Sequence, residues 1–168
     1  MKFIIKIYLF VSVVLFADEP IGMNLENIIA NDSLVFSVKQ SYFNCYPYGV
    51  IPLEKLLRDK HVSKVCQNEY LIFKKRYPKL YFFAFYHLHV RQNYMVKLQK
   101  EGCLIFSKGK KTYSEILLEQ GLAIIDPKIK NQEYDFYFFN AQARAKREKK
   151  GLWGDPAMQK CKAELLRK

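Results

Sequence analysis

The stretch that decides the fold runs from Tyr113 to Asp155 and reads YSEILLEQGLAIIDPKIKNQEYDFYFFNAQARAKREKKGLWGD. Thr112, just before it, and Glu115 have the spacing of a capping box, in which each side chain satisfies a free backbone N–H at the start of a helix. Gly121 is expected to end that helix, because glycine enters the left-handed cap conformation without a Cβ penalty. The sequence therefore predicts a short helix that begins after Thr112.

A second helix is predicted from about residue 134 to residue 150 of this stretch. Its apolar residues recur at helical spacing and form one stripe. The stripe consists of Tyr134, Phe138, Ala141 and Ala145. Gly151 is expected to end the helix, after which Leu152 and Trp153 fold back as anchors.

These two helices carry a family resemblance. Gln-Gly-Leu-Ala at 120–123, a loop and then AQARAKREKKGLWGD at 141–155 resemble the C-terminal third of the staphylococcal nuclease-like (thermonuclease) family. The resemblance implies an α+β fold, a small five-stranded OB-fold-like β-barrel packed with about three helices. In that family these helices pack the barrel and hold no catalytic residue, so the function depends on the earlier part of the chain.

The first 17 residues resemble a secretory signal peptide. Lys2 and Lys6 precede an apolar run from residue 7 to residue 16, and Ala17 is a small residue at the expected cut. An uncleaved membrane anchor is the alternative. We therefore expect an exported protein, periplasmic or secreted, with a nuclease-like domain over residues 18–155 and a C-terminal tail over residues 156–168.

The chain contains four cysteines, Cys45, Cys66, Cys103 and Cys161. An even number in an exported chain favours two disulfides, with three possible pairings, whereas buried free thiols are the alternative. Cys161 is expected to take part, because the tail beyond Gly154 otherwise lacks an anchor.

The net charge is strongly positive, with 28 Lys and Arg against 16 Asp and Glu. Removal of the leader with its two lysines leaves +10. Such a charge attracts polyanions such as nucleic acid, anionic lipid or lipopolysaccharide. The candidate contacts are Arg58, Arg91, Lys97, Lys100, Lys108 and Lys110.

Between the leader and Thr112 the pattern predicts strands and helices in alternation. We expect an irregular lead-in over residues 18–31, a strand from Ser33 to Val38, and helices starting near Lys55 and Val65. The aromatic run LYFFAFYHLHV at 80–90 is the strongest strand signal. A hairpin is expected over residues 94–106. No segment after the leader is long and apolar enough to cross a membrane.

The resemblance implies a calcium ion held by carboxylates, a Glu acting as general base and two Arg that stabilise charge on the phosphate. Asp32, in Ala30-Asn31-Asp32-Ser33, stands where the family's Asp-Gly-Asp-Thr motif places a calcium ligand. An ordinary turn before a strand is the alternative interpretation.

Glu54 keeps the place of the general base in a second motif and is also a candidate calcium ligand. A Glu just after Pro is equally typical of the first turn of a helix. Ile51 stands where the second calcium carboxylate belongs, and Tyr46 stands where the first Arg belongs. The second Arg position falls at Glu101, which reverses the charge.

Weaker signals accompany these motifs. His87 and His89 would share one face of the predicted strand as metal ligands, although packed histidines are the simpler interpretation. Tyr81, Phe83 and Phe85 on the same strand could stack nucleic-acid bases, although a core stripe is commoner.

The sequence therefore predicts an exported nuclease-like domain with a degraded catalytic site that binds nucleic acid or another polyanion. One alternative is a divergent calcium-dependent nuclease in which Arg58 or Arg91 supplies the missing charge. The other is a non-catalytic periplasmic interaction or assembly factor that reuses the barrel.

Overall fold

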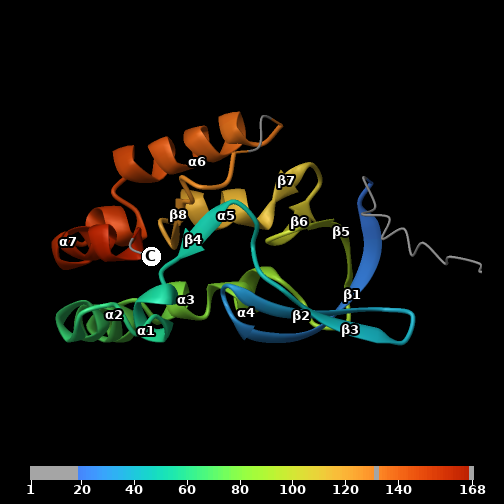
Figure 1. The fold of residues 1–168 in the computed structure, drawn as a ribbon, viewed down its shortest axis with the longest axis horizontal. Coiled ribbons are helices and arrows are strands. Elements are labelled where there is room, and N and C mark those ends of the chain that lie inside the picture. Colours follow the sequence, from blue (N-terminus) through green and yellow to red (C-terminus); the bar gives the residue numbers. More distant parts are fainter. Residues whose placement is uncertain (1–18, 131–132, 167–168) are drawn as a thin grey trace, which may run out of the picture.

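The computed structural model describes residues 19–130 and 133–166 as an α+β structure (Figure 1). The predicted leader, residues 1–17, lies outside the described residues. The strands are β1 (Ile21–Ala30), β2 (Ser33–Val38), β3 (Ser41–Cys45), β4 (Val50–Pro52), β5 (Asn93–Gln99), β6 (Gly102–Lys108), β7 (Lys111–Thr112) and β8 (Ala123–Ile125). The helices are α1 (Lys55–Arg58), α2 (Lys64–Arg76), α3 (Pro78–Tyr81), α4 (Phe83–His87), α5 (Tyr113–Glu119), α6 (Asp135–Arg147), the 3-10 turn η1 (Gly151–Gly154) and α7 (Pro156–Leu165).

The main sheet is antiparallel, with the strand order β3-β2-β1-β5-β6-β7, and β4 pairs separately with β8. The α+β class is confirmed. The five-stranded barrel with about three helices was wrong, because the described residues form six sheet strands that do not close and seven α-helices. Closure is limited to one bridge, Pro47 to Cys103. The bridge is made by two backbone hydrogen bonds, from the Cys103 N–H to the Tyr46 carbonyl at 2.8 Å and from the Tyr48 N–H to the Cys103 carbonyl at 3.0 Å.

Strand β1 corrects the expectation of an irregular lead-in. Met23, Leu25 and Ile28 are buried, so one face of the strand points into the core. The pairing of β1 with β2 shifts register between Leu25 and Asn27. Such a bulge breaks the alternation of apolar residues, which explains why the sequence pattern did not indicate a strand.

The aromatic run over residues 80–90 is helical, and the predicted strand was wrong. Pro78 occupies the first position of α3, where a proline loses no helical hydrogen bond. In α4 the His87 ring stacks on the Phe83 ring at 3.7 Å between centroids, a contact between residues i and i+4. His87 and His89 therefore do not share a strand face, and Phe83 is buried whereas Phe85 is exposed.

The two predicted C-terminal helices are confirmed as α5 and α6. The Glu115 carboxylate accepts from the Thr112 N–H at 2.7 Å, and the Glu115 N–H donates to the Thr112 hydroxyl at 3.2 Å. Gly121 has φ +65°, and a Cβ there would lie 2.2 Å from the Lys150 carbonyl oxygen, so only glycine fits. All four residues of the α6 stripe are buried. Helix α6 ends at Arg147, slightly earlier than expected.

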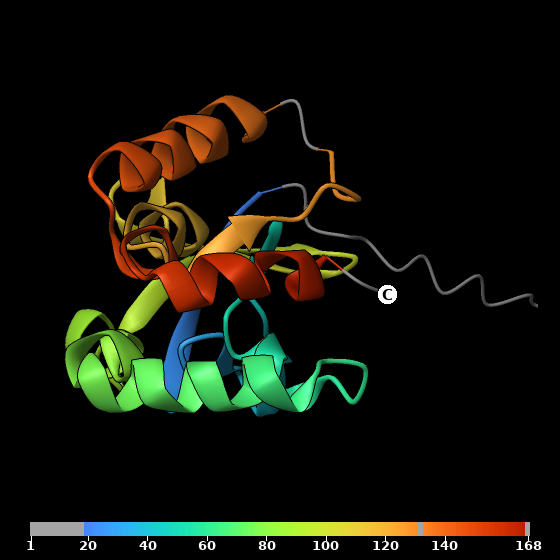
Figure 2. The same ribbon diagram turned by 90° about the vertical axis from the view of Figure 1, so that its left-hand side faces the viewer.

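Two disulfides join distant parts of the chain. Cys45 pairs with Cys103 and Cys66 pairs with Cys161, which confirms the prediction that Cys161 takes part. The second disulfide anchors α7, which forms where the sequence suggested only a tail. Figure 2 shows α7 running alongside α2. None of the described helices is both long and apolar enough to span a membrane.

Candidate functional site

Asp32 lies in the tight turn between β1 and β2, and its side chain is buried. Its carboxylate forms an ion pair with Arg58, which reaches it from α1. The neighbouring Asn31 fixes the turn, because its amide donates to the Leu80 carbonyl at 2.9 Å and accepts from the Ala84 N–H at 2.8 Å. The aromatic segment α3–α4 thus holds Asp32 in place.

Glu54 lies between β4 and α1, and only 7% of its surface is exposed. Burial raises the pKa of Glu54, and hydrogen bonds from its own backbone, from Asn31 and from Tyr70 offset part of that rise. Burial together with the Glu54 charge also raises the pKa of Tyr70 and of Tyr113. Glu54 therefore sits in an apolar, aromatic environment that favours its neutral, protonated form.

Three buried oxygen atoms in this region have no hydrogen-bond partner among the described residues. They are Asp32 Oδ1, Glu54 Oε2 and the Tyr113 hydroxyl. Buried polar atoms are rarely left unpaired, so these atoms mark a strained or functional region. Asp32, Glu54, Arg58, Tyr70 and Tyr113 are called the carboxylate cluster below.

The residues of the carboxylate cluster do not fit a calcium ion. Calcium takes six to eight oxygen ligands, usually with several carboxylates. Asp32 already has a cation in Arg58, and the next expected carboxylate position is the buried, apolar Ile51. Within the described part of the chain, no group of three or more His, Cys, Asp or Glu residues could hold a metal ion.

Of the two arginines expected to supply charge, the structure brings only Arg58 to the cluster. Arg91 lies in a turn with φ +68°, and its backbone N–H donates to the Leu25 carbonyl at 2.7 Å. Its charge helps to lower the pKa of Glu26, after the hydrogen bonds from Ser37 and Asn24. Arg91 therefore belongs to a different part of the surface.

The predicted polyanion contacts do not form one group. Lys97 pairs with Glu133 at 3.5 Å, and Lys110 lines a separate pocket next to Lys111. The side chain of Lys108 lies outside the described residues. Lys100 is exposed in the turn between β5 and β6.

A pocket of about 230 Å³ contains Lys100 and the position where the second arginine was expected. Its lining consists of Tyr48, Gln99, Lys100, Glu101, Lys128, Ile129 and Lys130. The sequence analysis missed Lys128 and Lys130, which follow β8. Two lysines separated by one residue in a turn are a weak signal in sequence. Their closeness to Lys100 becomes evident only when the fold places the β5–β6 turn beside them. Lys100, Lys128 and Lys130 are called the basic loop surface below.

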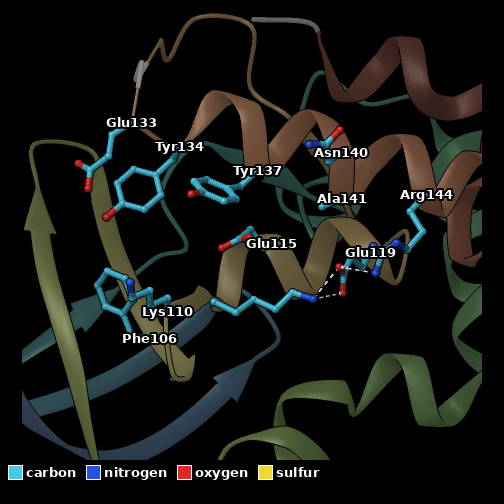
Figure 3. A pocket seen from close by; sticks show the side chains of 11 residues that line it. Phe106, Lys110, Glu115, Glu119, Glu133, Tyr134, Tyr137, Asn140, Ala141 and Arg144 are labelled. Carbon is cyan, nitrogen blue, oxygen red and sulfur yellow. Dashed lines mark hydrogen bonds and ion pairs between the residues drawn. The ribbon is translucent and has the colours of Figure 1, made fainter.

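The larger pocket, about 670 Å³, lies between α5 and α6 (Figure 3). Lys111 contacts both carboxylate oxygens of Glu119 at 2.6 Å, and Arg144 contacts one of them at 3.3 Å. At the other end Tyr134 lies beside Glu133, and burial raises the pKa of Tyr134 to about 12. Because Lys111 and Arg144 both bind Glu119, this pocket is a poor site for phosphate.

A family model matches the part of the chain that forms strands β5 to β8 and helices α5 and α6. Residues 90–155 match the family model described as Staphylococcal nuclease homologue. This match confirms the resemblance seen in the sequence. It includes Glu101 but neither Asp32 nor Glu54. No curated protein matches the chain.

Proposed function

We propose that this staphylococcal nuclease-like domain binds nucleic acid through the basic loop surface and hydrolyses it poorly. The observation that carries the proposal is the ion pair between Arg58 and Asp32. It places a fixed cation on the carboxylate that would otherwise bind calcium. Arg58 therefore neutralises a protein charge, which weakens its attraction for a phosphate.

The other expected catalytic groups are also missing from their places. Tyr46 and Glu101 stand at the two arginine positions, and Glu101 would repel a phosphate. Glu54 is enclosed by aromatic residues, and its pKa is raised by burial. A general base must lie within hydrogen-bond reach of the water it activates. Loss of one such charge-stabilising group typically lowers the rate by about 10²–10³.

The binding half of the proposal depends on charge. Lys100, Lys128 and Lys130 come together at one pocket although they belong to two separate turns, so three cations face the single carboxylate of Glu101 there. The whole chain has 28 Lys and Arg against 16 Asp and Glu. Contacts of lysine with phosphates release counterions, so the affinity should fall steeply with salt.

Export is part of the proposal. The pairs Cys45–Cys103 and Cys66–Cys161 support it, because disulfides persist in oxidising compartments and are rare in the cytosol. Residues 1–17 remain a predicted signal peptide.

A divergent nuclease is the second candidate, and one observation favours it. Asp32 Oδ1 and Glu54 Oε2 are both buried without a hydrogen-bond partner among the described residues, and a buried unpaired carboxylate oxygen could accept a bond from a bound cation's hydration shell. Two carboxylates alone form an incomplete calcium site, so this candidate requires ligands from the substrate or from water.

The test of binding is fluorescence anisotropy with single-stranded and duplex DNA and RNA at increasing salt. The variant replaces Lys100, Lys128 and Lys130 by Ala. We expect weaker binding to every sequence and a salt slope smaller by roughly one per lysine that contacts phosphate. A matched control removes three exposed lysines from α1–α2 and α7, namely Lys60, Lys64 and Lys160. Equal losses in both variants, or no binding at low salt, would contradict the proposal.

A further inference from the structure

One continuous segment of the chain has no acidic residue. From Tyr70 to Lys100 the sequence contains seven Lys or Arg and no Asp or Glu. This segment covers the second half of α2, both α3 and α4, and strand β5. Within this segment Arg76 pairs with Asp155, and Lys97 pairs with Glu133. Its charge toward a partner therefore comes mainly from Lys74, Lys75 and Lys79 around α3.

The same segment exposes aromatic rings that contact one another. Phe82, Phe85 and Tyr86 are 43%, 48% and 63% exposed. The Lys74 ammonium lies 3.8 Å from the centre of the Tyr81 ring, the Tyr81 and Phe82 rings are 4.5 Å apart, and the Phe82 and Phe85 rings are 6.0 Å apart. Lys75 and Lys79 are exposed in the same segment, at the end of α2 and in α3. Lys74, Lys75, Lys79, Tyr81, Phe82, Phe85 and Tyr86 are called the aromatic–lysine surface below.

The rings of Phe82, Phe85 and Tyr86 are exposed, whereas the Tyr81 ring is half-buried. None of the seven residues of the aromatic–lysine surface lines either pocket described above. A group of exposed rings outside both of these pockets presents a surface to a partner. Such a surface suits a flat partner, such as a membrane interface, into which exposed side chains can insert.

Helix α6 provides an internal comparison. Phe136, Tyr137 and Phe139 are 70%, 54% and 61% exposed, so their apolar exposure is at least as large. The acidic residues Glu133 and Asp135 stand directly beside them in the sequence. Figures 1 and 2 place α6 on the side of the molecule opposite α2. The two aromatic surfaces thus differ in that acidic residues stand beside the α6 rings in the sequence, although Glu133 pairs with Lys97.

We propose that the aromatic–lysine surface docks on a bilayer surface that contains anionic phospholipid. The lysines attract the anionic headgroups, and each lysine near such a surface strengthens binding roughly fivefold. The phenylalanine and tyrosine rings enter the interfacial layer, where amphipathic and aromatic side chains are favoured. The α6 rings, with two acidic residues next to them in the sequence, serve as the comparison surface.

The location of the contact can be tested with tryptophan as a reporter in the full chain. Phe85→Trp and Phe139→Trp are compared on vesicles of phosphatidylcholine with and without phosphatidylglycerol, with brominated acyl chains as quencher. We expect quenching of the new tryptophan in Phe85→Trp only, and only with phosphatidylglycerol. The parent protein, whose single tryptophan is Trp153, gives the baseline that is subtracted, so the added quenching reports on the substituted position. Quenching of Phe139→Trp alone, or of neither variant, would overturn the proposal.

Sedimentation with the same vesicles measures the energetic contribution of the surface. Phe82→Ala with Phe85→Ala should weaken binding to anionic vesicles about tenfold, because two exposed rings lose their apolar contact. The matched pair Phe136→Ala with Phe139→Ala should change it less than twofold. Lys75→Ala with Lys79→Ala avoids any effect on packing and should weaken binding roughly 25-fold.

Nucleic acid is the competing partner for the same surface. The Lys75 and Lys79 variant should keep its DNA affinity within threefold, whereas the variant of the basic loop surface should keep its vesicle affinity. A loss of DNA binding in the Phe82 and Phe85 variant, with vesicle binding unchanged, would assign the surface to nucleic acid and end the lipid proposal.

Discussion

Residues 90–155 and residues 19–89 differ in how far their local sequence determines their structure. Residues 90–155 match the staphylococcal nuclease family, and their helices begin and end at local signals such as Thr112, Glu115 and Gly121. Residues 19–89 contain Asp32 and Glu54, whose partners come from distant positions in the chain. The family match therefore describes a scaffold, while most of the site chemistry lies outside it. A retained scaffold does not guarantee a retained reaction.

The largest expected effect concerns the connection between α2 and α7. Replacing Cys66 and Cys161 by Ser should lower the free energy of unfolding by roughly 4–5 kcal/mol, because the disulfide closes a long loop. The two cysteines are 95 residues apart. Denaturant unfolding with and without reductant measures this change.

The matched control replaces Cys45 and Cys103, which are 58 residues apart and join β3 to β6. Its effect should be slightly smaller, because loop entropy grows slowly with length. Each disulfide joins a cysteine before residue 90 to one after it, so both variants test how far the two parts depend on each other. A loss below about 1 kcal/mol in both variants would show that they fold together without the cross-links.

Glu54→Gln tests the carboxylate cluster at a residue of the 19–89 part, outside the family match. Folding raises the pKa of Glu54 above 4.5, so protonated Glu54 stabilises the fold below about pH 4.5, and this stabilisation is lost as pH rises through the raised pKa. Glutamine resembles the protonated side chain and does not ionise. We expect the variant to be more stable than the parent by roughly 1–3 kcal/mol at pH 8, with the difference vanishing at low pH.

Thermal or denaturant unfolding of both proteins between pH 4 and pH 8 measures this difference. Glu115→Gln is the control, because Glu115 is equally buried but caps a helix through its carboxylate. That control should be destabilised. A Glu54→Gln protein less stable than the parent at pH 8 would mean that the ionised carboxylate has a stabilising partner.

Thr112→Ala tests residues 90–155, which match the family model, and should have the smallest effect on stability. Removal of the hydroxyl breaks one half of the capping box at the start of α5, which typically costs about 1 kcal/mol. Thr112→Ser keeps the hydroxyl and should restore most of this loss. Equal unfolding midpoints for the Thr and Ala proteins would show that packing alone fixes the start of α5.

The sequence predicted those features that depend on neighbouring residues. The capping box, the α6 stripe and the strand Ser33–Val38 needed only local spacing, and all were confirmed. Strand β1 was missed because a bulge hides its alternation, and α4 was taken for a strand because aromatic residues are common in strands.

The candidate site was predictable only in part. Asp32 and Glu54 were found through motifs, but whether they are buried depends on helices α1 and α2 and on α3–α4. The ion pair of Asp32 with Arg58 depends on the position of α1, which local spacing does not fix. Likewise, Lys128 and Lys130 meet Lys100 only because two turns come together in the fold.

We propose that the chain keeps the scaffold of the staphylococcal nuclease family while its carboxylate cluster does not catalyse cleavage. The most direct measurement is the cleavage rate of single-stranded DNA with calcium and with chelator, for the parent protein and for Glu54→Gln. We predict slow cleavage in the parent, no more than a twofold effect of calcium and no more than a twofold effect of the substitution. Fast, calcium-dependent cleavage that Glu54→Gln abolishes would contradict the account and would show that Asp32 and Glu54 form a working metal site beside Arg58.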